Sequence, residues 1–438
     1  MEKGDFIMLF GISPLIALLP LILYIILAFK DINPILNVFV CVIITGILTN
    51  QPLLDMGSVI AESLGSFLSL VGFIIMLGSA LGAILKKTGV AENIVRTVMK
   101  KIGINTEKKA ILASMATSMI LTALLGTLAG ANAIIAPIVI PLVAAIGMTP
   151  SSLSVVFMGA GLTGLFIGPF SPQVVTIMGL TKLTYGQYLL SAGIPVTIVC
   201  LIVTYIMANR IQNSTKGIYS YENVESINEN DIPKKEVRIG TYTFIMILLI
   251  LIVYGVYAKS GAAYAVVVMF TTAIITGIAA KLSLNDIFDT MVEGASKTMW
   301  LFIMFILFDP FINFVEQSGA FKELVILLHP LLSSGSKVVF SLVSTLTGIF
   351  GIGGAAVAQS VVMDKMFKGF VQELSISPGL WAMILLVGSQ ITSFAYPEAD
   401  MLGQMGLARS KDLKNMVKFG VVVVLVNLVM IFIRSFLG

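Results

Sequence analysis

Residues Gly168-Pro169-Phe170-Ser171-Pro172 interrupt an otherwise apolar segment, and Ser393-Phe394-Ala395-Tyr396-Pro397 interrupt a second one. Proline lacks a backbone donor and clashes with the preceding helical turn, so each run predicts a break in a helix. The first run lies within the 72 residues from Ala110 to Thr181, which contain no Asp, Glu, Lys or Arg. A membrane crossing needs about 20 apolar residues. We therefore predict broken helices at membrane depth, where unwound backbone must face protein or a cavity.

The composition of the whole chain supports a polytopic membrane protein. Of its 438 residues 57% are hydrophobic and 11% are charged, whereas roughly 25% are charged in a typical soluble protein. The net charge is only +4, and the basic residues lie beside hydrophobic segments. We therefore expect a lipid bilayer around the chain and no nucleic-acid partner. The sequence contains no GxSxG, HExxH or Walker A motif in a suitable context, which predicts that the chain is not an enzyme and needs no cofactor.

The chain contains two copies of one sequence pattern, as many carriers do. Two pairs of segments match between the copies: Ile43 to Gly46 with Ile274 to Gly277, and Met178-Gly179-Leu180 with Met405-Gly406-Leu407. In each copy a glycine, Gly193 or Gly420, follows the central glycine of the second segment after 14 residues. The predicted organisation is repeat 1 over residues 1–209, a linker over 210–239 and repeat 2 over 240–438.

Each repeat is predicted to contain five membrane crossings and one re-entrant hairpin. The predicted hairpins are residues 109–147 and 336–372, and the broken helices are residues 152–180 and 378–407. Because five is an odd number, the two repeats are predicted to be inverted relative to each other. The side reached after odd numbers of crossings carries 19 of the 27 Lys and Arg residues, and the other side carries 8. The positive-inside rule then places the linker in the cytoplasm and both termini outside a bacterial inner membrane.

The hairpin tips and the helix breaks supply the candidate site. Half-helix N-termini direct N–H groups at an anion, while C-termini and unwound carbonyls suit a cation. The solute-binding candidates are Thr127, Asn132, Ser171, Gln173, Thr176, Gln359, Ser360, Ser393 and Tyr396. Carboxylates at membrane depth are costly and usually handle ions, so the candidates for cation or proton coupling are Asp309, Glu398 and Asp400.

Structural roles are open for several of these candidates. Asp309 is followed by Pro310, so it could be the N-cap of a helix that restarts there. Glu398 and Asp400 could form structural ion pairs. Asn132 and Gln359 could satisfy backbone groups at the hairpin tips.

The order of segments resembles the ion transporter superfamily. The run from Gly168 to Leu180 resembles C4-dicarboxylate carriers, and the run from Tyr396 to Phe419 looks like the end of citrate and gluconate carriers. The opening, Pro14 to Phe29, is similar to bacterial Na+/H+ antiporters of the NhaC type. The resemblance implies a homodimer with a fixed scaffold and a mobile transport domain, which works as an elevator.

The sequence as a whole predicts a secondary active transporter of a small organic anion, such as a carboxylate or an amino acid, coupled to Na+ or H+. The transported Na+ would be the metal ion involved. A Na+/H+ antiporter without an organic substrate is the alternative, favoured by the excess of acidic over basic residues at membrane depth. A channel or a sensor is a third class, which broken helices and paired hairpins suit less well.

Overall fold

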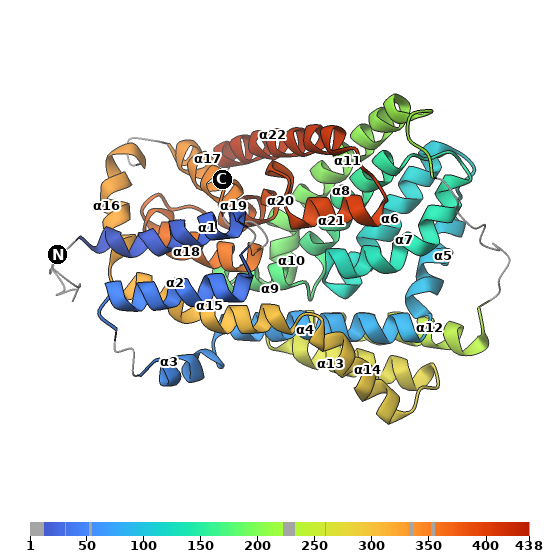
Figure 1. The fold of residues 1–438 in the computed structure, drawn as a ribbon, viewed down its shortest axis with the longest axis horizontal. Coiled ribbons are helices and arrows are strands. Elements are labelled where there is room, and N and C mark those ends of the chain that lie inside the picture. Colours follow the sequence, from blue (N-terminus) through green and yellow to red (C-terminus); the bar gives the residue numbers. More distant parts are fainter. Residues whose placement is uncertain are drawn as a thin grey trace.

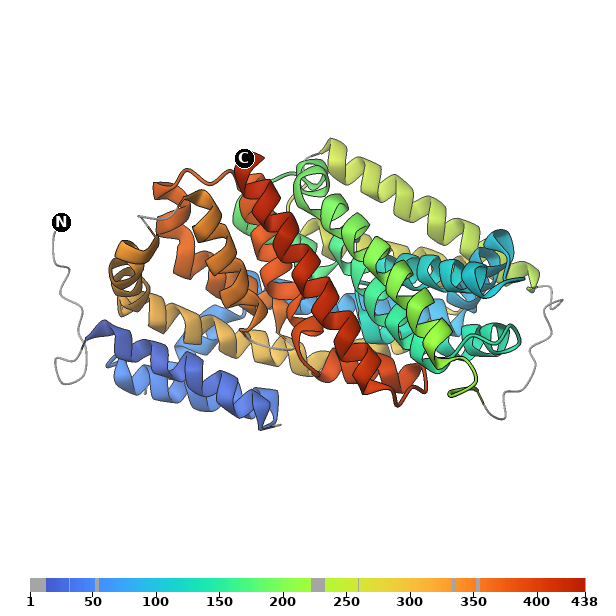
Figure 2. The ribbon, with the colours of Figure 1, turned by 90° about the horizontal axis from the view of Figure 1, so that it is seen from above.

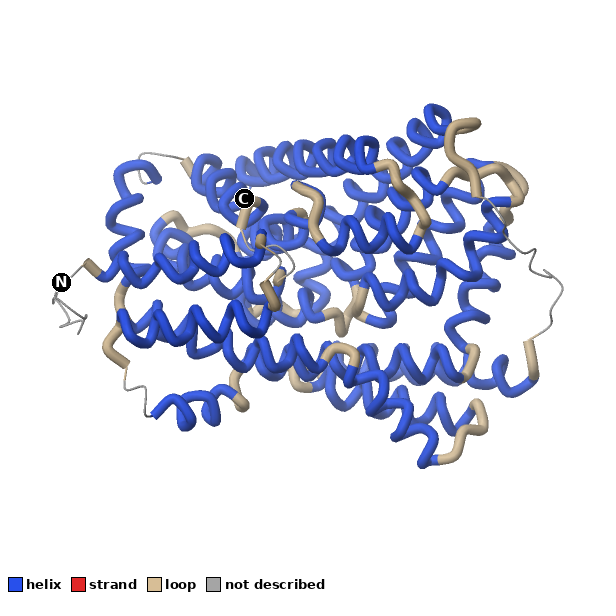
Figure 3. Tube along the Cα trace, viewed as in Figure 1, coloured by secondary structure: helices blue, strands red, loops and turns tan. Residues whose placement is uncertain are grey.

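The computed structural model describes residues 13–30, 32–51, 55–221, 233–258, 260–332, 336–351 and 355–437, and every regular element among them is a helix (Figure 3). Residues 352–354 of the second predicted hairpin tip and most of the predicted linker lie outside the described residues. In the described part of the chain seven helices are long and apolar enough to cross a membrane, and six apolar helices are shorter. The prediction of an all-α, multi-pass membrane protein is confirmed.

The two halves of the chain have the same order of helices. The first half contains η2 (Pro14–Leu18), α1 (Leu19–Phe29), α2 (Pro34–Leu48), α3 (Met56–Ser63), α4 (Phe67–Lys87), α5 (Val90–Ile102), α6 (Glu107–Leu125), α7 (Leu128–Ala144), α8 (Pro150–Ile167), α9 (Pro172–Thr181), α10 (Tyr185–Tyr188), η4 (Leu189–Gly193) and α11 (Ile194–Thr215). The second half contains α12 (Lys235–Tyr257), α13 (Tyr264–Ala279), α14 (Leu284–Ser296), α15 (Met299–Gln317), α16 (Ala320–Leu332), α17 (Lys337–Ile349), α18 (Ala356–Glu373), α19 (Pro378–Gln390), α20 (Thr392–Ala395), α21 (Ala399–Leu407) and α22 (Leu413–Leu437).

The helices pack in two groups, and each group takes members from both halves. In the first group α2 packs on α15, α13 packs on α4, and α4 packs on both α14 and α15 along the lower part of Figure 1. In the second group α9 packs on α18 and α19, while α7 and α8 pack on α21. Figure 2 shows α11 and α22 side by side on the face of this second group. Helices α5 and α16 contact both groups, α5 through α12 and α6, and α16 through η2 and α18.

The interrupted helices lie in the second group, and glycine allows the last helix of each half to approach them. Helix α8 ends at Ile167 before α9 begins, and α19 ends at Gln390 before α20 and α21. A Cβ atom on Gly193 would lie 3.0 Å from the Phe166 carbonyl oxygen, and one on Gly420 would lie 2.1 Å from the Phe394 carbonyl oxygen. The two repeated glycines therefore have the same packing role in the two halves.

Helix α15 continues through Pro310 without a break, so the alternative in which Asp309 caps a helix restarted at Pro310 is wrong. Proline removes only one donor from the ladder of hydrogen bonds. The buried side chains of Phe308 and Phe311 on either side pack in an apolar cluster with α2 and α4, and tertiary packing of this kind supplies most of a helix's stability. The two cysteines, Cys41 and Cys200, are buried free thiols, as predicted.

The amphipathic helix α14 is anchored to the basic end of α4. Ser283 caps α14 and its hydroxyl bonds to the Asp286 carboxylate at 2.6 Å. Lys87 donates to Thr290 at 3.0 Å, and its ammonium lies 3.6 Å from Asp286. The hydrogen bond from Ser283 and the charge of Lys87 lower the pKa of Asp286 below its ordinary value.

Candidate functional site

A cavity of about 170 Å³, called the inner cavity below, lies where helix ends from both halves meet. Its lining residues are Ile75, Gly126, Thr127, Leu165, Pro172, Gln173, Leu301, Phe305, Ala355, Ala356, Val357, Ser389, Gln390, Thr392, Ser393 and Asp400. They come from the α6–α7 turn, the α8–α9 break, the start of α18 and the α19–α21 break, with α4 and α15 on one side. The volume is similar to that of a ~150 Å³ cavity that binds benzene. The inner cavity therefore has room for a small organic molecule.

Three helices begin at the inner cavity without a side-chain cap. These are α7, α9 and α18, whose N-cap residues are Thr127, Ser171 and Ala355. The helices that lead into the site, α6, α8 and α19, instead begin with capping hydroxyls, which are Thr106, Thr149 and Ser377. First-turn N–H groups have no partner within their helix, and the helix dipole places partial positive charge there. Three such starts around one cavity favour an anionic group.

Gln173 offers a buried acceptor at the inner cavity. Its Nε2 donates to Ser360 Oγ at 2.7 Å and to Ser389 Oγ at 2.6 Å. Both hydroxyls donate to backbone carbonyls of their own helices, at Ala356 and Leu385, so they can only accept from Gln173. This fixes the orientation of the amide. Among the described residues Oε1 then has no hydrogen-bond partner, although the side chain is only 1% exposed.

One carboxylate lines the inner cavity, and none of its lining residues is a lysine or an arginine. It belongs to Asp400, in the first turn of α21, whose Oδ2 accepts from Ser393 Oγ at 3.2 Å. An anion and this carboxylate would repel each other in a site of low dielectric constant. Binding of an anion next to Asp400 therefore calls for a cation or a proton.

Asn132 holds helices together and does not line the inner cavity. Its Oδ1 accepts from Ser118 Oγ at 2.7 Å, and its Nδ2 donates to the Phe157 carbonyl at 3.0 Å and to Gln404 Oε1 at 2.7 Å. These contacts join α7 to α6, α8 and α21. The arrangement corresponds to the structural role that was open for Asn132.

Two other candidates of the first half, Ser171 and Thr176, are also bonded to backbone. Ser171 Oγ donates to the carbonyls of Leu165 and Gly168 across the helix break, and Thr176 Oγ1 donates to the Pro172 carbonyl at 2.7 Å. Neither residue lines the inner cavity, whereas Thr127 does.

In the second half Ser393 and Asp400 line the inner cavity, and Ser360 reaches it through Gln173. Gln359 joins α18 to its neighbours, because its Nε2 donates to the carbonyls of Gly348 and Gly388. Tyr396 and Glu398 lie in the extended segment before α21 and do not line the inner cavity. The Tyr396 hydroxyl donates to the Gly351 carbonyl at 3.4 Å.

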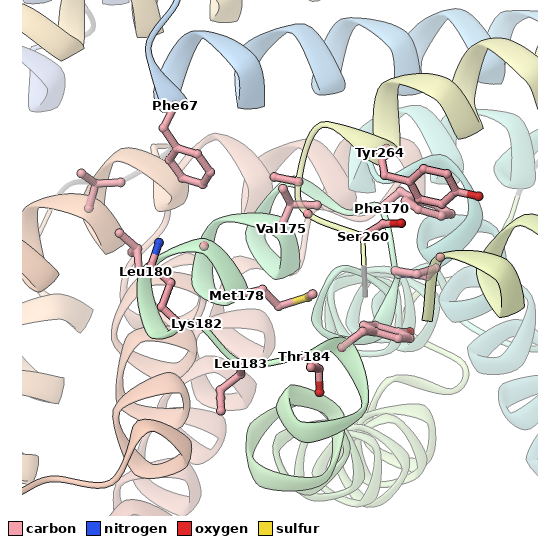
Figure 4. A pocket seen from close by; sticks show the side chains of 18 of the residues that line it. Phe67, Phe170, Val175, Met178, Leu180, Lys182, Leu183, Thr184, Ser260 and Tyr264 are labelled. Carbon is pink, nitrogen blue, oxygen red and sulfur yellow. The ribbon is translucent and has the colours of Figure 1, made fainter. Parts of the chain in front are cut away.

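Asp309 lies in a second and larger space, called the outer cavity below, of about 930 Å³. Figure 4 shows Phe67, Met178, Lys182 and Tyr264 around it. The helices α4, α9, α15 and α18 line both cavities. On α15, Phe305 faces the inner cavity and Asp309 faces the outer one, about 6 Å further along the helix at 1.5 Å per residue. The outer cavity therefore lies on the approach to the inner cavity, and the candidate acids Asp309 and Asp400 lie in different cavities.

Sequence reasoning missed several residues at these cavities. Ser389, a partner of Gln173, lies in an apolar helix and carries no local signal. Lys365 and Asp364 are charges within the apolar segment predicted as a hairpin, and that depth was the signal that could have identified them. The Asp364 carboxylate accepts from Trp381 Nε1 at 2.7 Å, while Lys365 lines the outer cavity.

Residues 10–276, more than half of the chain, match the sequence profile described as GntP family permease. The search of curated proteins gives no match. Among solved structures, the YdaH transporter of Alcanivorax borkumensis is 14% identical, with 88% of each chain covered and a TM-score of 0.48. MtrF of Neisseria gonorrhoeae, described with a class of antimetabolite efflux pumps, is 15% identical over 88% of this chain and 83% of that chain, with a TM-score of 0.48.

Proposed function

We propose that the chain, which belongs to the GntP permease family, is a cation-coupled secondary transporter that carries a small organic anion through the inner cavity. Family membership makes it a membrane transport protein of organic anions. The observation that carries the proposal is the inner cavity itself. Three uncapped helix starts and the unpartnered Gln173 Oε1 surround a space with no basic side chain in its lining.

The chemistry of the lining supports a carboxylate or an amino acid as the solute. The N–H groups at the helix starts match a carboxylate, and Gln173 Oε1 matches a hydroxyl or an ammonium donor on the rest of the molecule. The volume of about 170 Å³ corresponds to about five or six water molecules at about 30 Å³ each. The solute is therefore small.

Asp400 supports coupling to a cation. Its carboxylate lines the same cavity as the anion, so H+ bound to the carboxyl, or Na+ bound beside it, would remove their repulsion. Ser393 and Thr392 supply further oxygen atoms at this position. Solute and cation then bind together, which is the requirement for symport.

The two packing groups support an elevator. The group that contains α6–α9 and α17–α22 would be the moving transport domain, and the group that contains α2–α4 and α13–α15 would be the scaffold. The exchange of equivalent contacts between the halves, α2 with α15 and α13 with α4, supports an inverted repeat. We place both termini outside a bacterial inner membrane and the linker in the cytoplasm, with two chains in a homodimer.

Na+/H+ exchange without an organic solute is the weaker alternative. A cation-only site needs its acids to converge, but Asp309 and Asp400 line separate cavities. Among the described residues no three His, Cys, Asp or Glu side chains come together to hold a metal ion.

The test is uptake by proteoliposomes that contain the purified protein. Labelled sugar acids, dicarboxylates and amino acids are offered with an imposed Na+ or proton gradient. We expect gradient-dependent accumulation of at least one small anion, which the unlabelled solute competes away. If no organic anion is taken up and added Na+ or Li+ instead collapses a proton gradient, the antiporter replaces this proposal.

A further inference from the structure

The wall between the two packing groups contains a charged bridge from α15 to α18. Lys365 Nζ of α18 donates to Asn313 Oδ1 of α15 at 2.9 Å and to Glu316 Oε2 of α15 at 2.5 Å. Asn313 Nδ2 in turn donates to Asp309 Oδ2 at 3.1 Å. One ammonium is thus linked to two acids of α15 through direct and relayed contacts.

This bridge lies beside an open space and not in a packed interface. Asp309, Asn313 and Lys365 all line the outer cavity. The Lys365 side chain is 24% exposed and that of Glu316 is 54% exposed. The remaining side chains at this junction, such as Ile312 and Val361, belong to one apolar cluster. The bridge therefore supplies the directional contacts between α15 and α18.

The equivalent junction of the first half is closed by small residues instead. Asp309 aligns near Gly78 of α4, and a Cβ atom on Gly78 would lie 2.8 Å from the Leu125 carbonyl at the end of α6. One turn further, a Cβ atom on Gly82 would lie 3.6 Å from the Leu125 side chain. The first-half junction is thus tightly packed, while the second-half junction borders the outer cavity and is bridged by charge.

We propose that Lys365 is a positioning residue for transport, and that its bonds to Asn313 and Glu316 hold α18 on α15 while the outer cavity is open. This inference rests on the proposed movement between the two packing groups. When the transport group moves, the bridge breaks, and the first-half junction around Leu125 opens as the second-half junction closes. The bridge therefore sets the ratio between the two arrangements, and it touches neither the solute nor Asp400.

The experiment reports this ratio through a cysteine placed at Leu125, which is 1% exposed. The full chain carrying Leu125→Cys is placed in lipid nanodiscs without solute, and its labelling by a small water-soluble maleimide is timed. The native Cys41 and Cys200 are buried, so the chain without Leu125→Cys gives the background. Lys365→Met is compared with Lys368→Met, which removes the same charge from an exposed position one turn along α18.

We expect Lys365→Met to raise the labelling rate of Cys at position 125 about fivefold, as expected for loss of an ion pair with charged hydrogen bonds. Lys368→Met should leave the rate unchanged. Glu316→Gln keeps the shape of an exposed side chain and should raise the rate in the same direction, so it decides the matter alone if Lys365→Met does not fold. Equal rates in Lys368→Met and in both bridge variants would overturn the proposal. Because no solute is present, that result would leave the uptake test of the proposed function unaffected.

Discussion

Gln173→Glu is the substitution that most sharply tests the inner cavity as an anion site. Glutamate has nearly the same shape as glutamine, so it introduces a negative charge without opening space. In the native protein Gln173 Nε2 donates to the hydroxyls of Ser360 and Ser389, which already donate to backbone carbonyls. A carboxylate oxygen at this position would face two acceptors until those hydroxyls rotate, and its charge would be aimed at the solute.

The expected size of the effect follows from Coulomb's law. Two unit negative charges about 5 Å apart repel by about 3 kcal/mol at an effective dielectric constant of about 20, which is on the order of a hundredfold in affinity. The assay is the concentration dependence of solute uptake at pH 8, where the new carboxyl is ionised. Thr181→Val is the matched control, since the Thr181 hydroxyl lies on the same helix and bonds to the Ile177 carbonyl at 2.7 Å.

We expect Gln173→Glu to raise KM for the anion by on the order of a hundredfold while Thr181→Val leaves KM unchanged. A cation site at Gln173 Oε1 would give the opposite result, since an added carboxylate would strengthen Na+ binding. An unchanged KM for the anion in Gln173→Glu would refute the placement of the solute at this residue.

Three further predictions concern coupling and stability. Asp400→Asn should leave solute binding intact and flatten its dependence on Na+ or H+, as measured by solute affinity against cation concentration; a dependence as steep as in the native chain would contradict the role of Asp400. Asn132→Leu removes three hydrogen bonds that join α7 to α6, α8 and α21, and at about 1 kcal/mol each it should destabilise the fold by roughly 3 kcal/mol; thermal unfolding in detergent measures this, and an unchanged Tm would refute it. Gly420→Ala should destabilise by about 1–3 kcal/mol, because the new Cβ would lie 2.1 Å from the Phe394 carbonyl, whereas Gly403→Ala on α21 meets nothing within 4 Å; equal Tm values for the two variants would show that the helices can move apart freely.

Local chemistry explains which parts of the fold could be predicted from the sequence. Proline acts on the turn that contains it, so the interruptions before Pro172 and around Pro397 could be placed without knowledge of the tertiary structure. Asp309-Pro310 shows the limit of the same rule, because packing of Phe308 and Phe311 keeps α15 continuous. A proline therefore predicts a break only where the surrounding helix is not held on both sides.

The candidate site was predictable only as a region. Polar residues at a helix start indicate that something polar is nearby, but not whether the side chain faces a cavity or a neighbouring helix. Gln173 and Asn132 have similar side chains in similar surroundings, yet only Gln173 keeps an acceptor without a partner at the inner cavity. Their partners, Ser389 and Gln404, lie more than 200 residues away in the sequence. Such pairings depend on how the two halves pack and leave no local pattern.

The central claim is that the solute anion binds in the inner cavity, and a protection measurement tests it most directly. Thr127→Cys places a thiol in the inner cavity and Met178→Cys places one in the outer cavity. Each variant is treated with a small permeant thiol reagent in the presence and absence of the transported anion and its coupling cation. We predict that the anion slows modification at position 127 and leaves position 178 unaffected. Protection at position 178 with none at position 127 would contradict the account.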